Sequence, residues 1–409
     1  MRLIKKVLDE NKIINIPKLG FYIFNEINTL WEKEDEEFIS KMIIHEYPKD
    51  MTGSKVRSAT HLMKVMAAEK GIEFNQNKDW FSVKNGMANI HTGEFRERVE
   101  EDFTTLTTNY NYNKDASTTE VETFLSEIAD EDQQRIRLLK QIMGYCLIKE
   151  CKYHKAFILY GKGRNGKSVF LQMIEKMVGT KNVSHIPIHG LDDHFKVIHM
   201  KDKLVNLSEE MNADNGEGTD VFKKAVAGDT VSGCLKGKDH IDFVPFAKLI
   251  FATNKIMTSK DTSEGYLDRL VFIDFPCKYV SEPTKDFHRK KEENYFEDKL
   301  LPNIPGAFLV AIEGLHDLIK EGKFVETEES AMHTEDVKRV SNAVYAFAND
   351  KKLNGTTYTM DDLYIKFQQW AQETGSGKFS KRRFVSEVKE TLNLTSAGSY
   401  APNTWKITW

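Results

Sequence analysis

Residues 161–168 have the types and spacing of a phosphate-binding loop. They read Gly-Lys-Gly-Arg-Asn-Gly-Lys-Ser and match the pattern G-x-x-x-x-G-K-[S/T]. In such a loop the glycines let backbone N–H groups curl around phosphate oxygens, the lysine contacts the β- and γ-phosphates, and the final hydroxyl ligates Mg²⁺. The alternative is a structural glycine turn. We predict a nucleotide site with Mg²⁺ that is formed by Gly161, Gly163, Arg164, Asn165, Gly166, Lys167, Ser168 and Val169.

A nucleotide site of this kind also requires a carboxylate at the end of a neighbouring strand. Residues 204–207 form a short apolar run that is followed by Ser208, Glu209 and Glu210. Such carboxylates hold Mg²⁺ through water and polarise the attacking water. A solvated strand end is the alternative. We predict that Glu209 and Glu210 are catalytic and that Glu209, with Ser168, is a metal ligand.

Two further polar residues complete the arrangement expected of an ATPase. Asn254 follows the apolar run 248–253, where its amide would sense the γ-phosphate or orient water, unless it caps a turn. Arg269 precedes the apolar run 270–273, where its guanidinium would stabilise transition-state charge in a neighbouring subunit, unless it forms a surface ion pair. We predict catalytic roles for Lys167, Asn254 and Arg269, in addition to the two glutamates.

The segments around these residues alternate between strand and helix patterns. Apolar runs of four or five residues predict buried strands at 156–160, 204–207, 248–252 and 270–273. Apolar residues spaced by three and four predict amphipathic helices at 169–178 and between residues 120 and 146. This order predicts an α/β class with a largely parallel sheet, whose strand ends would carry the residues named above.

The N-terminal end of the chain reads as small β units. Aromatic and β-branched runs within 15–45 predict a β-meander with a helix after it, and the turn signals near Asn85 and Gly86 predict a second β unit at 80–95. The polar segment 109–119 reads as a linker.

The C-terminal end reads as helical, with a final hairpin. We expect helix over 281–325, then further helices from residue 342 and a hairpin at 400–409. This pattern suggests a winged helix, in which Lys381, Arg382 and Arg383 would contact DNA near the start of a helix. A protein-docking or structural role is the alternative for that unit.

These patterns divide the chain into five expected units. They are an α+β collar or adaptor domain at 1–115, a helical segment at 116–150, the nucleotide-binding core at 151–280, a helical extension at 281–335 and a winged-helix-like domain at 336–409.

Composition narrows the class of protein. The chain has 409 residues, of which 40% are hydrophobic and 29% charged, which predicts a soluble protein of several domains. No apolar run approaches the roughly 18 residues that cross a bilayer, so no membrane role is expected. Four cysteines without a CxxC pair indicate buried free thiols in a reducing compartment, and we expect a cytoplasmic location. The net charge of −4 does not favour DNA binding unless basic residues are concentrated locally.

In their order along the chain, these motifs resemble the superfamily 3 helicases, in particular the helicase module of the phage and plasmid primase-helicase family. The resemblance covers about residues 15–325 and rests on residues 84–93, 138–147, 161–168, 204–209, 223–229, 251–254 and 265–275. The sequence departs from the family at Asp268, where a second arginine is frequent, and at Ala227, where glycine is frequent. Arg269 is then the only arginine-finger candidate.

The resemblance implies an AAA+-type P-loop ATPase core, a hexameric ring, ATP with Mg²⁺, and 3′-to-5′ translocation on single-stranded DNA. It implies that Lys223 contacts nucleotide or the neighbouring subunit. It also makes residues 232–242 a β-hairpin in the ring channel, where Lys236, Lys238 and His240 would grip DNA phosphates. Without the family, the same segment is an exposed hairpin tip.

Residues 1–115 hold no carboxylate cluster of the kind that a primase or polymerase needs, because Glu34, Asp35, Glu36 and Glu37 form one contiguous run. Family members often carry a primase domain before this region. The chain is therefore compatible with being the C-terminal part of a longer primase-helicase, or with acting beside a primase, a polymerase domain or another replisome protein.

Three functions fit the sequence. The leading hypothesis is an ATP-driven replicative helicase of a phage or plasmid, which acts on single-stranded and forked DNA. The second is a DNA-binding initiator or loader, in which nucleotide binding drives assembly without processive unwinding. The third is a P-loop ATPase that acts on protein, against which the lysines of 232–242 argue.

Overall fold

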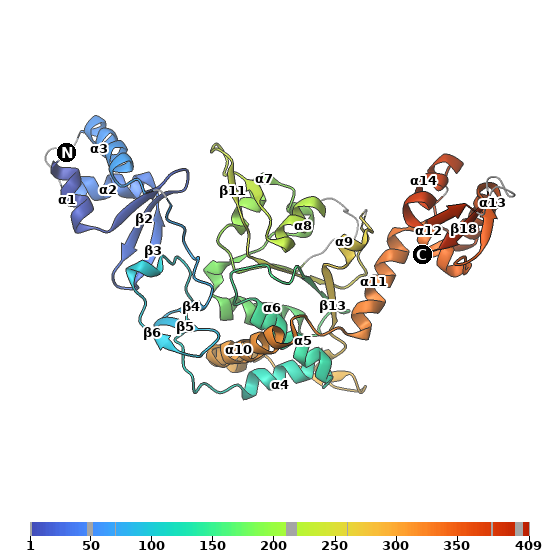
Figure 1. Ribbon diagram of the computed structural model, residues 1–409. Coiled ribbons are helices and arrows are strands. Elements are labelled where there is room, and N and C mark those ends of the chain that lie inside the picture. Colours follow the sequence, from blue (N-terminus) through green and yellow to red (C-terminus); the bar gives the residue numbers. More distant parts are fainter. Residues whose placement is uncertain are drawn as a thin grey trace.

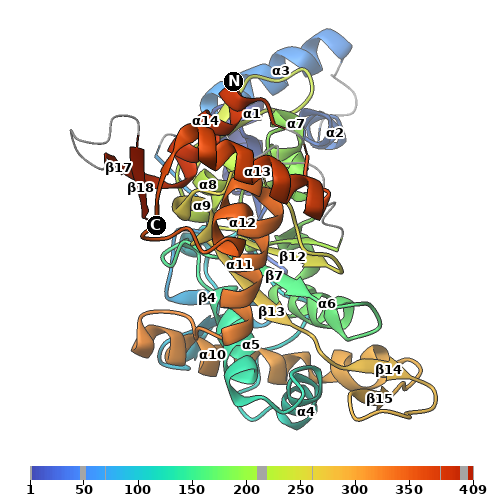
Figure 2. The ribbon, with the colours of Figure 1, turned by 90° about the vertical axis from the view of Figure 1, so that its right-hand side faces the viewer.

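The computed structural model describes residues 2–46, 52–69, 71–209, 219–259, 261–377, 379–396 and 404–408. Three parts follow one another across the molecule in Figure 1: an N-terminal part in blue, a central part built on a sheet, and a C-terminal part in red. Helix α11 (Glu328–Ser341) leads from the central part to the C-terminal part, which faces the viewer in Figure 2.

Five parallel strands form the centre of the molecule, in the order β13, β7, β12, β9, β8. They are β7 (Ala156–Tyr160), β8 (Val183–Ser184), β9 (Val205–Ser208), β12 (Lys248–Thr253) and β13 (Leu270–Asp274). Strands that are apolar on both faces are typical of a parallel sheet covered on both sides. The α/β class and the four expected strands are confirmed, whereas the short edge strand β8 was not predicted.

Helices cover both faces of this sheet (Figure 1). One face carries α4 (Thr119–Ile128), α5 (Gln133–Tyr145), α6 (Lys167–Val178) and α10 (Ile304–Glu321), and the other carries α7 (His194–Val197), α8 (Thr219–Ala227) and α9 (Glu264–Leu267). A hydrophobic core lies on each face of the sheet, and alternate residues of β7 point into the two cores. Phe157 and Leu159 pack in one core, and Ala156 and Ile158 pack in the other. The helices expected at 120–146 and 169–178 are confirmed.

The N-terminal part contains two small antiparallel sheets. Its elements are α1 (Arg2–Glu10), β1 (Ile13–Ile16), β2 (Gly20–Asn25), β3 (Leu30–Glu34), α2 (Glu36–Glu46), α3 (Gly53–Met66), β4 (Trp80–Val83), β5 (Gly86–Asn89) and β6 (Phe95–Arg96). Arg98 joins the two sheets, because its guanidinium donates to the carbonyl oxygen of Thr29 at 2.9 Å and to Oγ of Ser82 at 2.7 Å. Both expected β units are confirmed, and α1 was not predicted.

The C-terminal part is a three-helix unit with a small sheet. It contains α12 (Ala343–Asp350), β16 (Thr357–Thr359), α13 (Met360–Thr374), α14 (Lys381–Thr391), β17 (Asn393–Ser396) and β18 (Thr404–Thr408). The strands are antiparallel in the order β16, β18, β17. Phe347, Phe367, Trp370 and Phe384 form its aromatic core. The expected helices are present. The hairpin expected at 400–409 is wrong in its bounds, because β18 pairs with β17, which follows α14 directly and lies before residue 400.

The expectation of helix throughout 281–325 is wrong for its first part. β14 (Lys278–Val280) pairs in parallel with β15 (His288–Lys290), and regular helix begins only with α10. The charged residues here suit a helix, but Pro283 lacks a backbone donor. The N–H of Tyr279 also donates to the carbonyl oxygen of Arg164 at 2.7 Å, which anchors the segment to another part of the chain.

Short turns complete the described structure. The 3₁₀ turns lie at Glu100–Asp102, Thr180–Asn182, Ile188–Gly190, Ile198–Met200 and Leu301–Asn303, and a π turn lies at Phe296–Leu300. All four cysteines are buried free thiols, as expected. Within the ranges given above, every helix is too short or too polar to span a bilayer, and no three metal-binding side chains gather as a cluster.

Candidate functional site

The loop between β7 and α6 has a tightly curled backbone. Gly163, Arg164 and Gly166 have φ angles of 93°, 54° and 89°, which lie in the left-handed region. Glycine adopts this region with little strain. Packing also excludes a side chain at Gly166, since an added Cβ would lie 2.6 Å from Cγ2 of Ile128. The loop therefore needs glycine at residue 166 for two independent reasons.

Lys167 is the first residue of α6, and its ammonium turns back into the loop. It donates hydrogen bonds to the carbonyl oxygen of Gly161 at 2.6 Å and to Oδ1 of Asn165 at 2.9 Å. Asn165 in turn donates through Nδ2 to the carbonyl oxygen of Phe275 at 3.1 Å. Lys167 is only 8% exposed, and this burial lowers its pKa to about 8.

Of the other predicted loop residues, some are exposed to solvent and one packs against the core. Gly163, Arg164 and Ser168 are exposed, so their polar atoms are open to a ligand. Val169 is half-buried and packs its side chain against the hydrophobic core, which leaves only its backbone for contact with a ligand.

Asn254 lies at the same edge of the sheet as the loop. The register aligns Thr253 of β12 with Tyr160 of β7. Asn254 therefore follows at the level of Gly161 on the adjacent strand, about 4.8 Å across the sheet. Its side chain is exposed. The parallel sheet places this amide beside the loop, as the sequence predicted.

Glu209 lies at this edge as well. Ser208, the last residue of β9, is aligned with Phe251 of β12, so Glu209 leaves the sheet two strands away from the loop strand. The strands β9 and β7 are about 10 Å apart across the sheet, and the register extended by one residue puts Glu209 level with Leu159, two residues before Gly161. The Glu209 side chain is exposed. Glu210, the second predicted carboxylate, lies outside the described residues.

Arg269 lies at the opposite edge of the sheet. Its carbonyl oxygen accepts a hydrogen bond from the N–H of Ala156 at 2.7 Å, at the start of β7, whereas the loop follows the end of that strand. The length of the strand separates the two positions by about 16 Å. The Arg269 Nη1 donates to the carbonyl oxygen of Gly265. Arg269 and the loop of the same chain are therefore not brought together.

Lys223 lies on α8 close to Arg269. Its Nζ is 2.8 Å from Oδ2 of Asp261 and 3.7 Å from Oδ1 of Asp220. The hydrogen bond to Asp261 raises the pKa of Lys223, and the charge of Arg269 opposes this rise. Lys223, Asp261 and Arg269 thus form one charged group.

The hairpin expected at 232–242 is confirmed. β10 (Val231–Gly233) pairs with β11 (Ile241–Phe243), and Ser232 lies opposite Asp242. Gly237 takes a φ of 74° at the tip. The three predicted phosphate-binding side chains, Lys236, Lys238 and His240, are all exposed. Their contact with DNA stays a prediction.

The basic residues of the C-terminal part begin α14, as expected. Lys381 forms an ion pair with Asp361 at 2.6 Å. Arg383 lies over the ring of Phe379, with its Cζ 3.9 Å from the ring centre. Arg382 is exposed. Two of the three side chains therefore already have contacts within the unit.

Several residues that support the loop have no signal in the sequence. Two of these residues follow β13: the N–H of Tyr279 donates to the loop backbone at Arg164, and the carbonyl oxygen of Phe275 accepts from Asn165. A third, Ile128 of α4, packs against Gly166. His333 of α11 also approaches this edge, with its Nε2 2.6 Å from Oδ1 of Asp274. All these contacts join segments far apart in the chain, so local patterns do not indicate them.

Two family models match parts of the chain. One is described as "D5 N terminal like" and matches residues 2–130, and the other is described as "Family of unknown function (DUF5906)" and matches residues 159–269. The second match includes the loop, Glu209, Asn254 and Arg269.

The curated relatives are viral proteins of low identity. "Putative helicase 121R" of Invertebrate iridescent virus 3 is 24% identical over 362 residues, which is 78% of this chain and 38% of the relative. "Putative helicase L207/L206" of Acanthamoeba polyphaga mimivirus is 21% identical over 346 residues, which is 78% of this chain and 36% of the relative. The chain thus spans less than two fifths of the length of these relatives.

Solved structures share the fold. Two apo structures of the NrS-1 C-terminal region match with TM-scores of 0.57 and 0.59 at 14% identity, and each match covers 99% of this chain and 98% of that one. The mixed α/β architecture with its central parallel sheet is therefore one already known.

Proposed function

We propose that this chain is the motor part of an ATP-dependent DNA helicase of the superfamily 3, primase-helicase type. The observation that carries the proposal is that Lys167, Asn254 and Glu209 all lie at the carboxyl ends of the parallel strands, where the curled loop 161–166 also lies. The names of the viral relatives and the match to the D5 model support the same function.

In this proposal the loop binds the phosphates of ATP through its backbone N–H groups. Lys167 exchanges its bonds to Gly161 and Asn165 for bonds to the β- and γ-phosphates. Asn254 orients the attacking water, and Glu209, together with Glu210, polarises it.

The residues present suit a magnesium ion. The Ser168 hydroxyl and the Glu209 carboxylate supply oxygen ligands, which Mg²⁺ prefers, and both residues are exposed near the same sheet edge. A bound Mg²⁺ would neutralise charge on the β- and γ-phosphates.

The position of Arg269 supports action on a neighbouring subunit. Because Arg269 lies away from the loop of its own chain, it serves the nucleotide of the next subunit in a hexameric AAA+-type ring, together with the neighbouring Lys223. The exposed hairpin with Lys236 and Lys238 then grips one DNA strand in the channel and moves it in the 3′-to-5′ direction. The C-terminal part acts as a winged helix that contacts DNA through α14.

ATP hydrolysis with and without single-stranded DNA tests the proposal. Wild type should hydrolyse ATP and be stimulated by DNA, whereas Lys167→Ala should lose activity by roughly 100-fold or more, as when other transition-state contacts are removed. Lys176→Ala, on the same helix, is the matched control and should retain activity. Equal hydrolysis by wild type and Lys167→Ala would contradict the proposal.

A further inference from the structure

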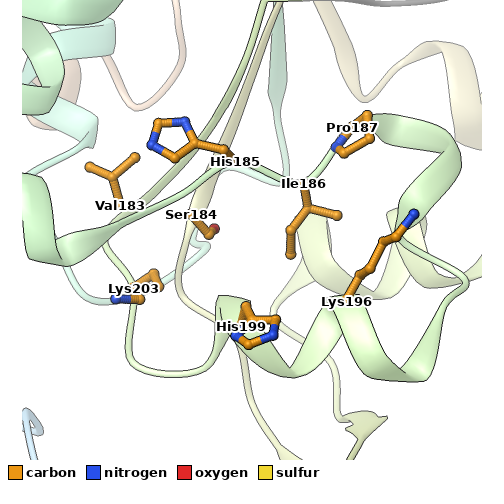
Figure 3. Close-up of a pocket in the computed structure, with 8 residues that line it drawn as sticks. All are labelled: Val183, Ser184, His185, Ile186, Pro187, Lys196, His199 and Lys203. Atoms are coloured by element: carbon orange, nitrogen blue, oxygen red, sulfur yellow. The ribbon is translucent and has the colours of Figure 1, made fainter. Parts of the chain in front are cut away.

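A basic pocket lies at the edge of the central sheet, beside β8. Its volume is about 460 Å³. Figure 3 shows the side chains that line it. Four lining side chains are basic: His185, Lys196, His199 and Lys203. The remaining lining residues of the described chain are Val183, Ser184, Ile186 and Pro187, so no carboxylate lines the pocket. Lys203 and Lys196 lie on opposite sides of it, with His199 between them in the view of Figure 3.

Among the described residues, Lys203 forms no ion pair and Lys196 forms only a long one. Lys203 donates its hydrogen bond to a neutral acceptor, the carbonyl oxygen of Lys181. The nearby Asp202 carboxylate is 2.6 Å from the ammonium of Lys201 and is therefore engaged with another lysine. Lys196 is 4.0 Å from Asp193, which is the outer limit of an ion pair. An anionic ligand would thus meet two ammonium groups with available charge.

The pocket adjoins the base of the β10–β11 hairpin. Helix α7 carries Lys196 into the pocket lining, while His194 of the same helix contacts the hairpin. The Nδ1 of His194 is 3.1 Å from the carbonyl oxygen of Ser232, and its ring centre is 5.4 Å from that of His240. Basic side chains therefore continue from the hairpin tip, across α7, to the edge of the sheet.

We propose that this pocket binds phosphate groups of a single-stranded nucleic acid that also contacts the hairpin. The inference rests on the proposed function and adds a second contact region for the same strand. A nucleic acid fits better than an isolated anion, because α7 contributes Lys196 to the pocket and, through His194, contacts His240 of the hairpin. It fits better than an acidic peptide, because the hairpin beside the pocket carries the exposed lysines that the proposed function assigns to a DNA strand.

The salt dependence of DNA binding tests this proposal. Each phosphate contact on a single strand contributes about 0.7 to the slope of log K against log salt concentration. Lys196→Ala/Lys203→Ala should therefore lower the slope by about 1.4. If wild type and the double variant bind an oligothymidine equally at 1 M salt, this difference in slope means that the variant binds it about 25-fold more weakly at 0.1 M salt. The control is Lys320→Ala/Lys323→Ala. Both lysines are exposed, Lys320 in α10 and Lys323 just after it, and their replacement should leave the slope unchanged.

The double variant should keep its thermal midpoint and its basal ATP hydrolysis without DNA, because neither lysine lies near the loop 161–166. If the alanine variant is unstable, Lys196→Gln/Lys203→Gln should show the same change in slope. An unchanged slope in a folded variant, with wild type binding DNA, overturns this inference alone. If the wild-type protein does not hydrolyse ATP, the proposed function is contradicted instead. Displacement of DNA by millimolar phosphate, or equal affinity for polyglutamate, would overturn the choice of nucleic acid.

Discussion

The ammonium of Lys167 donates a hydrogen bond to the carbonyl oxygen of Gly161, six residues earlier, over 2.6 Å. This bond closes the loop 161–166 on itself, and Asn165 completes the contact with a second acceptor at 2.9 Å. The loop therefore holds its lysine with its own oxygens, which a phosphate would have to replace.

Binding of nucleotide should take up a proton in mildly alkaline solution. Burial lowers the pKa of Lys167 to about 8, so the free protein loses this proton as pH rises through 8. A bound phosphate favours the charged ammonium and raises the pKa again. At pH 8.5 we expect uptake of up to about 0.8 proton per nucleotide, and at pH 6.5 almost none from this group.

Calorimetry in buffers of different ionisation enthalpy measures this uptake. Lys167→Arg is the control, because a guanidinium stays protonated throughout this range. Proton uptake at pH 8.5 that is equal in wild type and Lys167→Arg would rule out Lys167 as the source.

Gly166→Ala should harm the loop more than Gly163→Ala. Both positions have left-handed φ angles, which cost about 1–2 kcal/mol for an L-residue. Only at Gly166 does the new Cβ also meet a neighbour, Ile128, whereas nothing lies within 4 Å at Gly163. We expect a larger drop in Tm and weaker nucleotide binding for Gly166→Ala. The same Tm for both variants would show that packing against Ile128 is unimportant.

Two inactive variants should restore activity when mixed. Lys167→Ala lacks the phosphate contact, and Arg269→Ala lacks the guanidinium, which as an arginine finger is worth about 1,000-fold in rate. In a randomly mixed ring with equal amounts of each, about one quarter of the interfaces combine an intact Lys167 with an intact Arg269 from the neighbour. Hydrolysis near one quarter of wild type is expected. No recovery after confirmed subunit exchange would argue that Arg269 does not act on the next subunit.

Gly314→Ala should destabilise the central part. Helices α5 and α10 cross so closely that a Cβ at Gly314 would lie 1.9 Å from the carbonyl oxygen of Lys140. Overpacking of this kind typically costs about 1–3 kcal/mol. Gly53→Ala in α3 is the control, because nothing lies within 4 Å of its added Cβ. A thermal scan should show a lower Tm for the first variant only, and an unchanged Tm for Gly314→Ala would contradict the close crossing.

Local patterns were sufficient for four of the five strands of the central sheet and for the loop. The run at 156–160 is apolar and buried on both faces, and the glycines at 163 and 166 are needed for their φ angles. The order of the strands in the sheet depends on packing between segments that are far apart in the chain, so local sequence patterns do not predict it. For example, β8 has only two residues, and it was not predicted because its pairing depends on β9.

Contacts between distant segments were the main part that the sequence did not indicate. Ile128 beneath Gly166 and the N–H of Tyr279 on Arg164 both support the loop from other elements. The charged segment after Val280 resembled a helix, but its backbone is paired in a short sheet. Hydrophobic periodicity reports which face of an element is buried, and it does not report what covers that face.

Strand displacement on a forked DNA duplex tests the central claim most directly. With ATP and Mg²⁺, wild type should release the labelled strand, and Lys167→Ala should release none above the level without ATP. The Lys176→Ala control should unwind as wild type does. DNA-stimulated ATP hydrolysis without displacement would favour a loader, and displacement that survives Lys167→Ala would contradict the proposed motor.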